Sequence, residues 1–218
     1  DVVHFTIQAS DLSGNTTQAH ADSNGNVWYS HMIGSGCSGS CGNPVNSSLG
    51  GKTETAQDLI VPGRSGTPIV IQRVYQSQTD YVGPLGKGWS FTYDYALEEV
   101  TTRLLDGVHI RYPDGHTANY AHDGNGRYDS VSPGMHEYLL KEGSGYALYM
   151  PDQTVYHFDG DGHLTRIVND KGGEITLTYS GEHLHTVMNE SGRVVTFGFT
   201  GGRITFITVS YTHLTLPT

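Results

Sequence analysis

Residues 158–207 decide the fold, because their apolar residues and glycines return at a fixed step: FDGDGHLTRIVNDKGGEITLTYSGEHLHTVMNESGRVVTFGFTGGRITFI. Leu164, Leu184 and Ile204 follow one another at a step of 20 residues. The same step relates a further set of positions: Ile167 with Val187 and Ile207, Gly172 with Gly192, Ile175 with Val195, Leu177 with Phe197, and Tyr179 with Phe199. So many matched positions indicate a structural repeat.

Each repeat unit has the pattern of a β-hairpin with one apolar face. Ile175, Leu177 and Tyr179 alternate with polar residues, which is the two-residue period of a strand. Glycine-rich turns separate one strand from the next. A lone hairpin is only marginally stable, so neighbouring units must stack to bury a continuous apolar surface.

The rest of the chain also favours strands. It has 218 residues, enough for a proper core, with 29 Gly and 14 Tyr. Pro-Asp pairs at the centres of residues 109–122 and 148–158 predict two further β-hairpins. No stretch has helical periodicity over a useful length. We therefore predict an all-β fold in which antiparallel β-hairpin repeats form part of a curved sheet.

The charge argues against two classes of partner. A formal net charge of -10 repels nucleic acid and anionic lipid. No window approaches the roughly 20 apolar residues of a membrane span. We therefore expect no nucleic-acid partner and no membrane insertion.

The two cysteines, Cys37 and Cys41, lie in a segment of Gly and Ser. A disulfide in an exported protein and two free thiols are both compatible with this spacing. A zinc site would need two more ligands, and His31 is the one near candidate.

Several acidic and histidine residues could carry chemistry, and each has a simpler structural explanation. The DGDG of residues 159–162 could hold calcium, but it lacks the ligand spacing of an EF-hand and is typical of a hairpin turn, as is the DGNG of residues 123–126. Glu98, Glu99 and Asp106 could supply the acid and base of a glycosidase, but the adjacent Glu98 and Glu99 point to opposite faces of a predicted strand and cannot both serve one site. His183 and His185 share a strand face and could hold a metal only with a third ligand. We predict no catalytic, cofactor-binding or metal site, no cofactor and no enzyme activity.

A set of aromatic residues could form a platform for sugar rings or fill the inner layer of a sheet, which is the commoner role. The set is Tyr75, Trp89, Tyr93, Tyr95, Tyr112, Tyr120, Tyr146 and Tyr149.

The order YxFDxxGxLxxIxxxxGxxIxLxY resembles the YD repeat of Rhs proteins. It is carried by Tyr156, Phe158, Asp159, Gly162, Leu164, Ile167, Gly172, Ile175, Leu177 and Tyr179. Upstream, GNPVNSSLGGKTETAQDLIVPGRSGTPIVIQRVYQSQ and GPLGKGWSFTY resemble the segment that opens the Rhs core of bacterial wall-associated and polymorphic-toxin proteins. The resemblance covers residues 42–207.

The resemblance implies a secreted or cell-surface protein whose repeats wind a β-sheet into a hollow shell around a variable C-terminal toxin. Related shells occur in insecticidal toxin complexes and in teneurin adhesion receptors. This chain holds about three repeats, too few for a closed shell. The expected partners are therefore downstream Rhs repeats and a toxin cargo absent from this chain. The alternative is a carbohydrate-binding or adhesive surface module that contacts cell-surface glycans.

The expected organisation has five parts. A β-sandwich remnant at the N-terminus would be the end of an upstream module. The 20-residue repeat pattern stops near residue 208, where the sequence VSYTHLTLPT resembles translated adapter sequence. The parts are the end of an immunoglobulin-like β module (1–32), a Gly/Ser linker (33–51), the Rhs core opening segment (52–155), YD-type repeats (156–208) and a non-native tail (209–218). We expect the chain to be a piece of a longer protein with a free sheet edge after Ile207.

Overall fold

The computed structural model describes residues 6–10, 16–21, 27–28, 45–46, 51–101, 106–132 and 134–210. Within these residues it contains strands and no helix, which confirms the all-β prediction. None of this part of the chain is therefore a helix long and apolar enough to cross a bilayer. The strands are β1 Thr6–Ser10, β2 Thr16–Ala21, β3 Val27–Trp28, β4 Val45–Asn46, β5 Gly51–Val61, β6 Ile69–Gln76, β7 Val82–Gly83, β8 Gly86–Lys87, β9 Trp89–Phe91, β10 Ala96–Thr101, β11 Asp106–Arg111, β12 Thr117–His122, β13 Arg127–Ser130, β14 Tyr138–Glu142, β15 Gly145–Tyr149, β16 Val155–Phe158, β17 Leu164–Val168, β18 Glu174–Ser180, β19 His183–Asn189, β20 Val194–Thr200 and β21 Arg203–Ser210.

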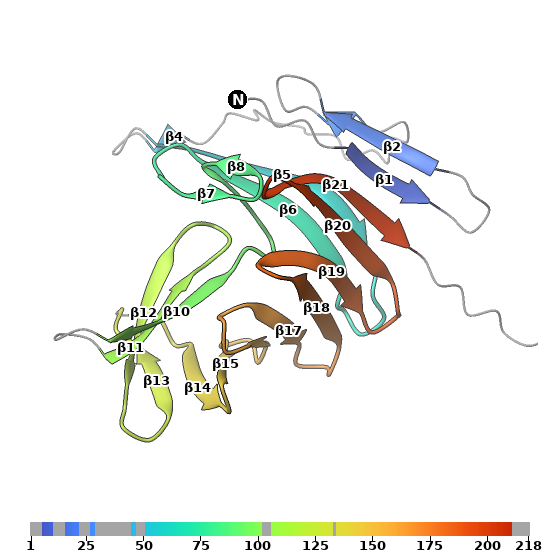
Figure 1. Ribbon diagram of the computed structural model, residues 1–218. Coiled ribbons are helices and arrows are strands. Elements are labelled where there is room, and N and C mark those ends of the chain that lie inside the picture. Colours follow the sequence, from blue (N-terminus) through green and yellow to red (C-terminus); the bar gives the residue numbers. More distant parts are fainter. Residues whose placement is uncertain are drawn as a thin grey trace, which may run out of the picture.

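A single 15-stranded sheet dominates the fold (Figure 1). It runs from β10 to β21 in chain order and continues through β1, β2 and β3. Each neighbouring pair from β10 to β21 is antiparallel, so this part is a meander of hairpins. In Figure 1 the sheet curls from β10–β13 at the lower left to β21 at the upper right. The predicted curved sheet of hairpins is confirmed.

The 20-residue repeat is present in the structure. Leu164, Leu184 and Ile204 are buried near the starts of β17, β19 and β21. Each of them pairs with an aromatic residue at or next to the end of the preceding strand: Phe158 with Leu164, Tyr179 with Leu184, and Phe199 with Ile204. The three residues therefore occupy equivalent places along one sheet.

A β-bulge recurs in each repeat and bends the sheet. The pairing skips Thr165, His185 and Thr205, which are again 20 residues apart. The hydroxyls of Thr165 and Thr205 donate to the carbonyl oxygens of His157 (3.1 Å) and Gly198 (3.3 Å) across the bulge. Because an extra residue bends its strand and increases the twist, a bulge at a constant interval gives the sheet a repeated curvature.

A small four-stranded sheet, in the order β4-β5-β6-β9, forms a second layer over part of the large one. Ile71 and Phe91 of the small sheet and Phe197 of the large sheet belong to one buried cluster, in which the rings of Phe91 and Phe197 are 5.7 Å apart. In Figure 1, β5 and β6 lie next to β19–β21. The core of this half of the molecule thus lies between two sheets.

An ion pair is buried at this interface. Arg73 donates from Nε to Asp58 Oδ2 (2.5 Å) and from Nη2 to Oδ1 (2.8 Å), and the two side chains are 8% and 3% exposed. Burial raises the pKa of Asp58, and the guanidinium of Arg73 opposes this effect. Asp58 lies at an irregularity in β5, where the pairing passes from Gln57 to Leu59.

A cluster of tyrosines fills the inner face of the sheet between β10 and β16. The hydroxyls of Tyr112 and Tyr120 share a hydrogen bond (2.7 Å), and the Tyr120 hydroxyl donates to the buried Glu137 (3.4 Å). The ring of Tyr95 lies 5.6 Å from that of Tyr112 and 5.4 Å from that of Tyr156. These hydroxyls satisfy one another in place of water.

Both hairpins predicted from Pro-Asp pairs are confirmed, as β11–β12 and β15–β16. The expected free edge after Ile207 is wrong, because β1 pairs with β21. The strands β1–β3 thus extend the large sheet, and their origin in an immunoglobulin-like module stays a prediction. Part of the expected linker forms β4, while Cys37 and Cys41 lie outside the described residues. The strand β21 continues to Ser210, and the non-native origin of residues 209–218 stays a prediction.

Alkaline titration tests the tyrosine cluster. Burial, the largest effect, raises the pKa of Tyr112 from 10.0 to about 12. Because the unfolded chain releases this proton first, the stabilisation is complete below pH 10 and is lost as the pH rises through about 12. We expect the free energy of unfolding in urea to fall over this range while tyrosinate absorbance appears. The double variant Tyr112→Phe, Tyr120→Phe should reduce this pH dependence, and ionisation of Tyr112 or Tyr120 near pH 10 in the folded protein would contradict the explanation.

Candidate functional site

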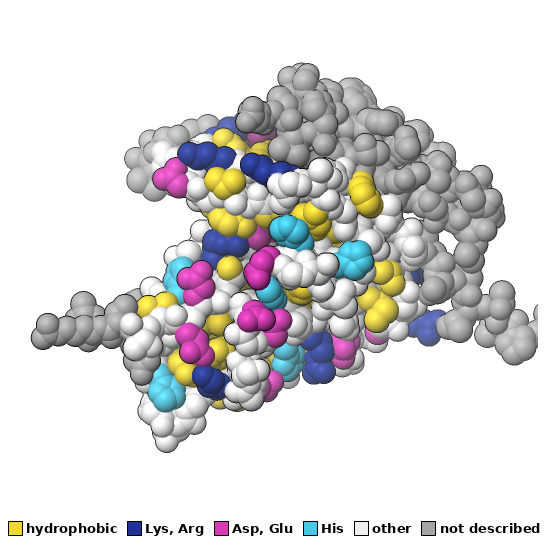
Figure 2. Space-filling model, viewed as in Figure 1, with side chains coloured by type: hydrophobic (Ala, Val, Ile, Leu, Met, Phe, Trp, Pro, Cys, Tyr) yellow, Lys and Arg dark blue, Asp and Glu magenta, His cyan; other side chains and the backbone are white. Residues whose placement is uncertain are grey.

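A groove of about 400 Å³ lies where the turns of the hairpins face the β7–β8 hairpin. A backbone hydrogen bond from Ile204 N to Pro84 O (2.9 Å) joins its two sides, and a second, from Leu97 N to Gly162 O (3.3 Å), lies next to the lining residues Tyr95 and His163 in the sequence. Figure 2 shows histidine and carboxylate side chains interspersed across the middle of the molecule. The volume is in the range of small-molecule sites.

Two histidine–aromatic stacks line this groove and follow the repeat. The ring of His163 lies 4.5 Å from that of Tyr179, and the ring of His183 lies 4.5 Å from that of Phe199, in nearly parallel planes. Arg203 occupies the third equivalent position. Residues 163, 183 and 203 therefore line the groove because they recur at the repeat step. The rings of Tyr179 and Phe199 each have one face covered by a histidine.

Asp94 lines the groove and is paired with two side chains. It accepts hydrogen bonds from the Tyr81 hydroxyl (2.7 Å) and from Arg111 Nη2 (3.1 Å), and the guanidinium stacks 3.9 Å from the Tyr81 ring. Burial raises the pKa of Asp94, and Arg111 and Tyr81 oppose this effect. These contacts fasten the loop before β7 onto the link between β9 and β10.

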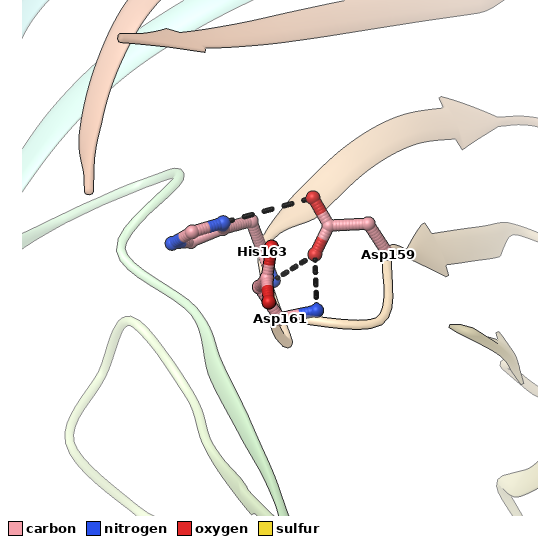
Figure 3. Close-up of side chains that lie close together, drawn as sticks. All are labelled: Asp159, Asp161 and His163. Carbon is pink, nitrogen blue, oxygen red and sulfur yellow. Dashed lines mark hydrogen bonds and ion pairs between the residues drawn. The ribbon is translucent and has the colours of Figure 1, made fainter. Parts of the chain in front are cut away.

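The closest approach to a metal site is the turn after β16 (Figure 3). Ligand atoms of Asp159, Asp161 and His163 all lie within 4.8 Å of one another. His163 Nδ1 is 3.6 Å from Asp159 Oδ2, and its Nε2 is 3.2 Å from Glu182 Oε2. Carboxylate and imidazole groups are ligands that divalent cations accept.

The geometry of Asp159 is explained by the turn itself. Its Oδ1 accepts the backbone N–H groups of Asp161 (3.0 Å) and His163 (2.9 Å), as the dashed lines in Figure 3 show. The side-chain oxygens of Asp123, Asn169 and Asn189 accept the corresponding two N–H groups in three other turns. Because a neutral asparagine does the same work, the carboxylate acts here as a turn cap.

The other residues considered from the sequence do not converge on a site. Glu98 and Glu99 are both exposed, and Glu99 accepts hydrogen bonds from the Tyr146 hydroxyl and Lys141, which hold the pKa of its carboxyl below the ordinary value. His183 and His185 are both exposed on β19 with the buried Leu184 between them. Because the pairing with β18 skips His185, their shared face stays a prediction.

Most of the aromatic set lies in the core. Tyr93, Tyr112, Tyr120 and Tyr146 are buried, and Tyr75, Trp89 and Tyr95 are partly buried. Tyr149 stacks on Tyr138 at 5.0 Å, with planes 4° apart. The guanidinium of Arg127 covers the Tyr138 ring at 3.8 Å. A sugar ring stacks on a free aromatic face, so the stacked faces of this pair do not form such a platform.

At the opposite ends of the hairpins, a strap formed by residues 62–67 (PGRSGT) binds two consecutive turns. Asn169 Nδ2 donates to Ser65 O (2.8 Å), and Asn189 Nδ2 donates to Pro62 O (3.0 Å). Arg193 Nη1 also donates to Pro62 O (2.8 Å). Each asparagine thus caps its own turn through oxygen and binds the strap through nitrogen.

The carboxylate of Glu190 is held by the strap. It accepts the backbone N–H groups of Arg64 and Ser65 (2.8 Å to Ser65) and the hydroxyl of Thr67. Burial opposes ionisation, but these hydrogen bonds outweigh it and keep the pKa of Glu190 below the ordinary value. The sequence analysis missed this contact. The recurrence of Asn169 and Asn189 at the repeat step was the signal that could have indicated it.

A comparison with family models identifies the segment that carries the strap. A family model described as a domain of unknown function, DUF6531, matches residues 42–120. The double-stranded DNA deaminase toxin A of Burkholderia cenocepacia is 36% identical over 66 residues. This match covers 29% of the chain and 4% of the toxin, so the chain spans a small part of that relative. Both findings are compatible with a polymorphic-toxin family.

Substitution of Asp159 separates a turn cap from a metal ligand. Asp159→Asn should leave the melting temperature unchanged, because an amide oxygen accepts the same two N–H groups. Asp159→Ala should cost about 1–2 kcal/mol of unfolding free energy, since those groups lose their partner. Calcium and zinc should shift the melting temperature of neither the parent nor Asp159→Asn. A metal-induced rise in the parent that disappears in Asp159→Asn would overturn the turn-cap explanation.

Substitution of Glu190 tests the strap. Glu190→Ala should lower the unfolding free energy by about 1–3 kcal/mol, because it leaves strap donors without their acceptor. Since the folded pKa is lowered, this stabilisation is present above the unfolded value of 4.5 and is lost as the pH falls through the folded pKa. Urea unfolding at several pH values measures both effects.

The control is Asp170→Ala, at the exposed equivalent position one repeat earlier. It should change stability by less than about 0.5 kcal/mol. Equal losses of unfolding free energy in Glu190→Ala and Asp170→Ala would show that the contact between Glu190 and the strap does not stabilise the fold.

Proposed function

We propose that this chain is a structural β-repeat shell module of a secreted or cell-surface Rhs-type protein. Its downstream repeats would complete a wall that encapsulates or presents a C-terminal toxin or effector, which lies outside this chain. The module itself is non-enzymatic and uses no cofactor. The match of DUF6531 to residues 42–120 and the similarity to a deaminase toxin support this assignment.

The observation that carries the proposal is the repeated bulge. Each hairpin carries one extra residue at the equivalent position, and these residues bend the sheet at equal intervals. They are Thr165, His185 and Thr205. Repetition of one bent unit produces a wall of constant curvature, because each unit contacts its neighbours in the same way. A continuation of the pattern would enclose a volume on the concave side.

The opening segment supports the proposal as the place where the wall starts. The strap binds the turns at one end of the hairpins, and the β7–β8 hairpin binds them at the other, through Pro84 O. Register is decisive in a one-faced sheet, because a slip by one residue would turn the apolar side chains outward. A segment that holds both ends fixes the register for the hairpins that follow.

Encapsulation needs a wall that holds its cargo without chemistry. The stacked hairpins would exclude proteases and water from the enclosed space, and the net charge of -10 disfavours binding of nucleic acid. We therefore propose the downstream repeats and the enclosed effector as the partners of this module.

Limited proteolysis of the full-length protein tests the proposal. The C-terminal domain should resist cleavage in the full-length protein and be cleaved when expressed alone. The double variant Asn189→Ala, Glu190→Ala should increase cleavage of the C-terminal domain at least several-fold, and Asp170→Ala should not. Circular dichroism confirms that each variant retains its strands.

Equal cleavage of the C-terminal domain alone and in the folded full-length protein would exclude a shell. If that result were accompanied by specific binding on a glycan array, the carbohydrate-binding alternative would replace the shell proposal. The feature that favours this alternative is the groove, where His163, His183 and Glu182 are accessible beside aromatic rings.

A further inference from the structure

The two ends of the β10–β21 meander differ in how their edges are protected. At β10, with the sequence ALEEVT, two exposed glutamates discourage pairing with another strand. The turn after β16 also covers this edge, because Leu97 N donates to Gly162 O (3.3 Å). Glu99 further binds Lys141 (2.9 Å) across the curl of the sheet. This edge needs no additional cover.

The strand β21 at the other end has none of these protections. Its sequence, RITFITVS, contains one charge and no Pro, Gly or Lys. Ile204, Ile207 and Val209 bury one face, while Phe206 is 46% exposed on the other. High β-propensity with low charge is the signature of a segment that pairs readily with a further strand.

The strand that covers this edge is β1, from the far end of the sequence (Figure 1). It pairs with β21 through four residue pairs, from Thr6 with Phe206 to Ala9 with Val209, and β2 then pairs with β1. This is the one parallel pair among the strand pairs of the described residues. The opposite edge of β21 makes seven antiparallel pairs with β20.

We propose that β1–β3 form an intramolecular cap on the β21 edge, and that uncapped β21 pairs antiparallel with β21 of a second copy. Parallel pairing is slightly less stable per residue than antiparallel pairing, and four pairs are fewer than the seven that β21 makes with β20. The cap prevails because it is in the same chain, where its effective concentration is of the order of millimolar. A second copy at micromolar concentration cannot compete with it. This inference concerns the chain on its own, because a downstream repeat of the proposed shell would pair with the same edge of β21 in place of β1.

The choice of a second copy as the occupant follows from the edge itself. An antiparallel β21–β21 pair places identical edges against each other around a two-fold axis, which gives a closed dimer. Each β21 strand then gains backbone hydrogen-bond partners for its open edge from an identical chain, without a different kind of molecule.

Size-exclusion chromatography with light scattering tests the cap. The intact chain should elute as a monomer of 23.7 kDa, and the chain without residues 1–32 should show twice the mass expected for its monomer, falling with dilution. Gln8→Pro in the intact chain should also produce dimers, because Gln8 lies in a strand paired on both sides and proline removes a ladder donor. This second variant keeps the test valid if the shortened chain does not fold.

Phe206→Lys is the matched control, because it places a charge on the exposed face of β21. It should return the shortened chain to a monomer and leave the intact chain monomeric and folded. In hydrogen exchange of dilute samples, the amides of residues 206–209 should exchange at least tenfold faster without the cap. Monomers at every concentration with unchanged exchange, or dimers that Phe206→Lys does not disrupt, would overturn the proposal.

Discussion

Each hairpin of the large sheet is apolar on one face only, and the rest of the structure depends on this constraint. A one-faced sheet needs a second layer. Over β18–β21 the small sheet supplies it, with Phe91 against Phe197. Between β10 and β17 the sheet curls until Leu97 reaches Gly162 and covers its own inner face. The opening segment therefore lies where the concave face would otherwise be open.

The ion pair between Asp58 and Arg73 has a particular consequence at the interface of the two sheets. Burial of an ion pair contributes little net stability, because desolvation offsets the attraction, but separation of the partners would leave a buried charge. Because Asp58 lies in β5 and Arg73 in β6, the pair ties these neighbouring strands of the small sheet together on the side that faces the large sheet. The apolar contacts hold the two layers together.

The sequence predicted the repeat and the hairpins, because alternation and turn residues are local signals. It also contained a sign of the bulge that we did not interpret. Leu164 and Ile167 are three residues apart, which a regular strand would place on opposite faces, yet both contact the core because Thr165 is skipped. The strap and the parallel pairing of β1 join residues more than 100 positions apart, and no local pattern encodes such contacts.

The strap of residues 62–67 directly holds the turns of only some of the hairpins. Asn169 and Asn189 both bind it, and the residue at the next step is Val209, which has no side-chain amide to donate and is buried in the core. The hold of the strap on the turns thus ends after two repeats, and the third repeat is held at its other end, where Ile204 N donates to Pro84 O. A hairpin beyond the third repeat would be placed by its pairing with the preceding strand. The edge of β21 is therefore the first position in the sheet where the placement of the next strand depends on pairing alone, and β1 of the same chain pairs there.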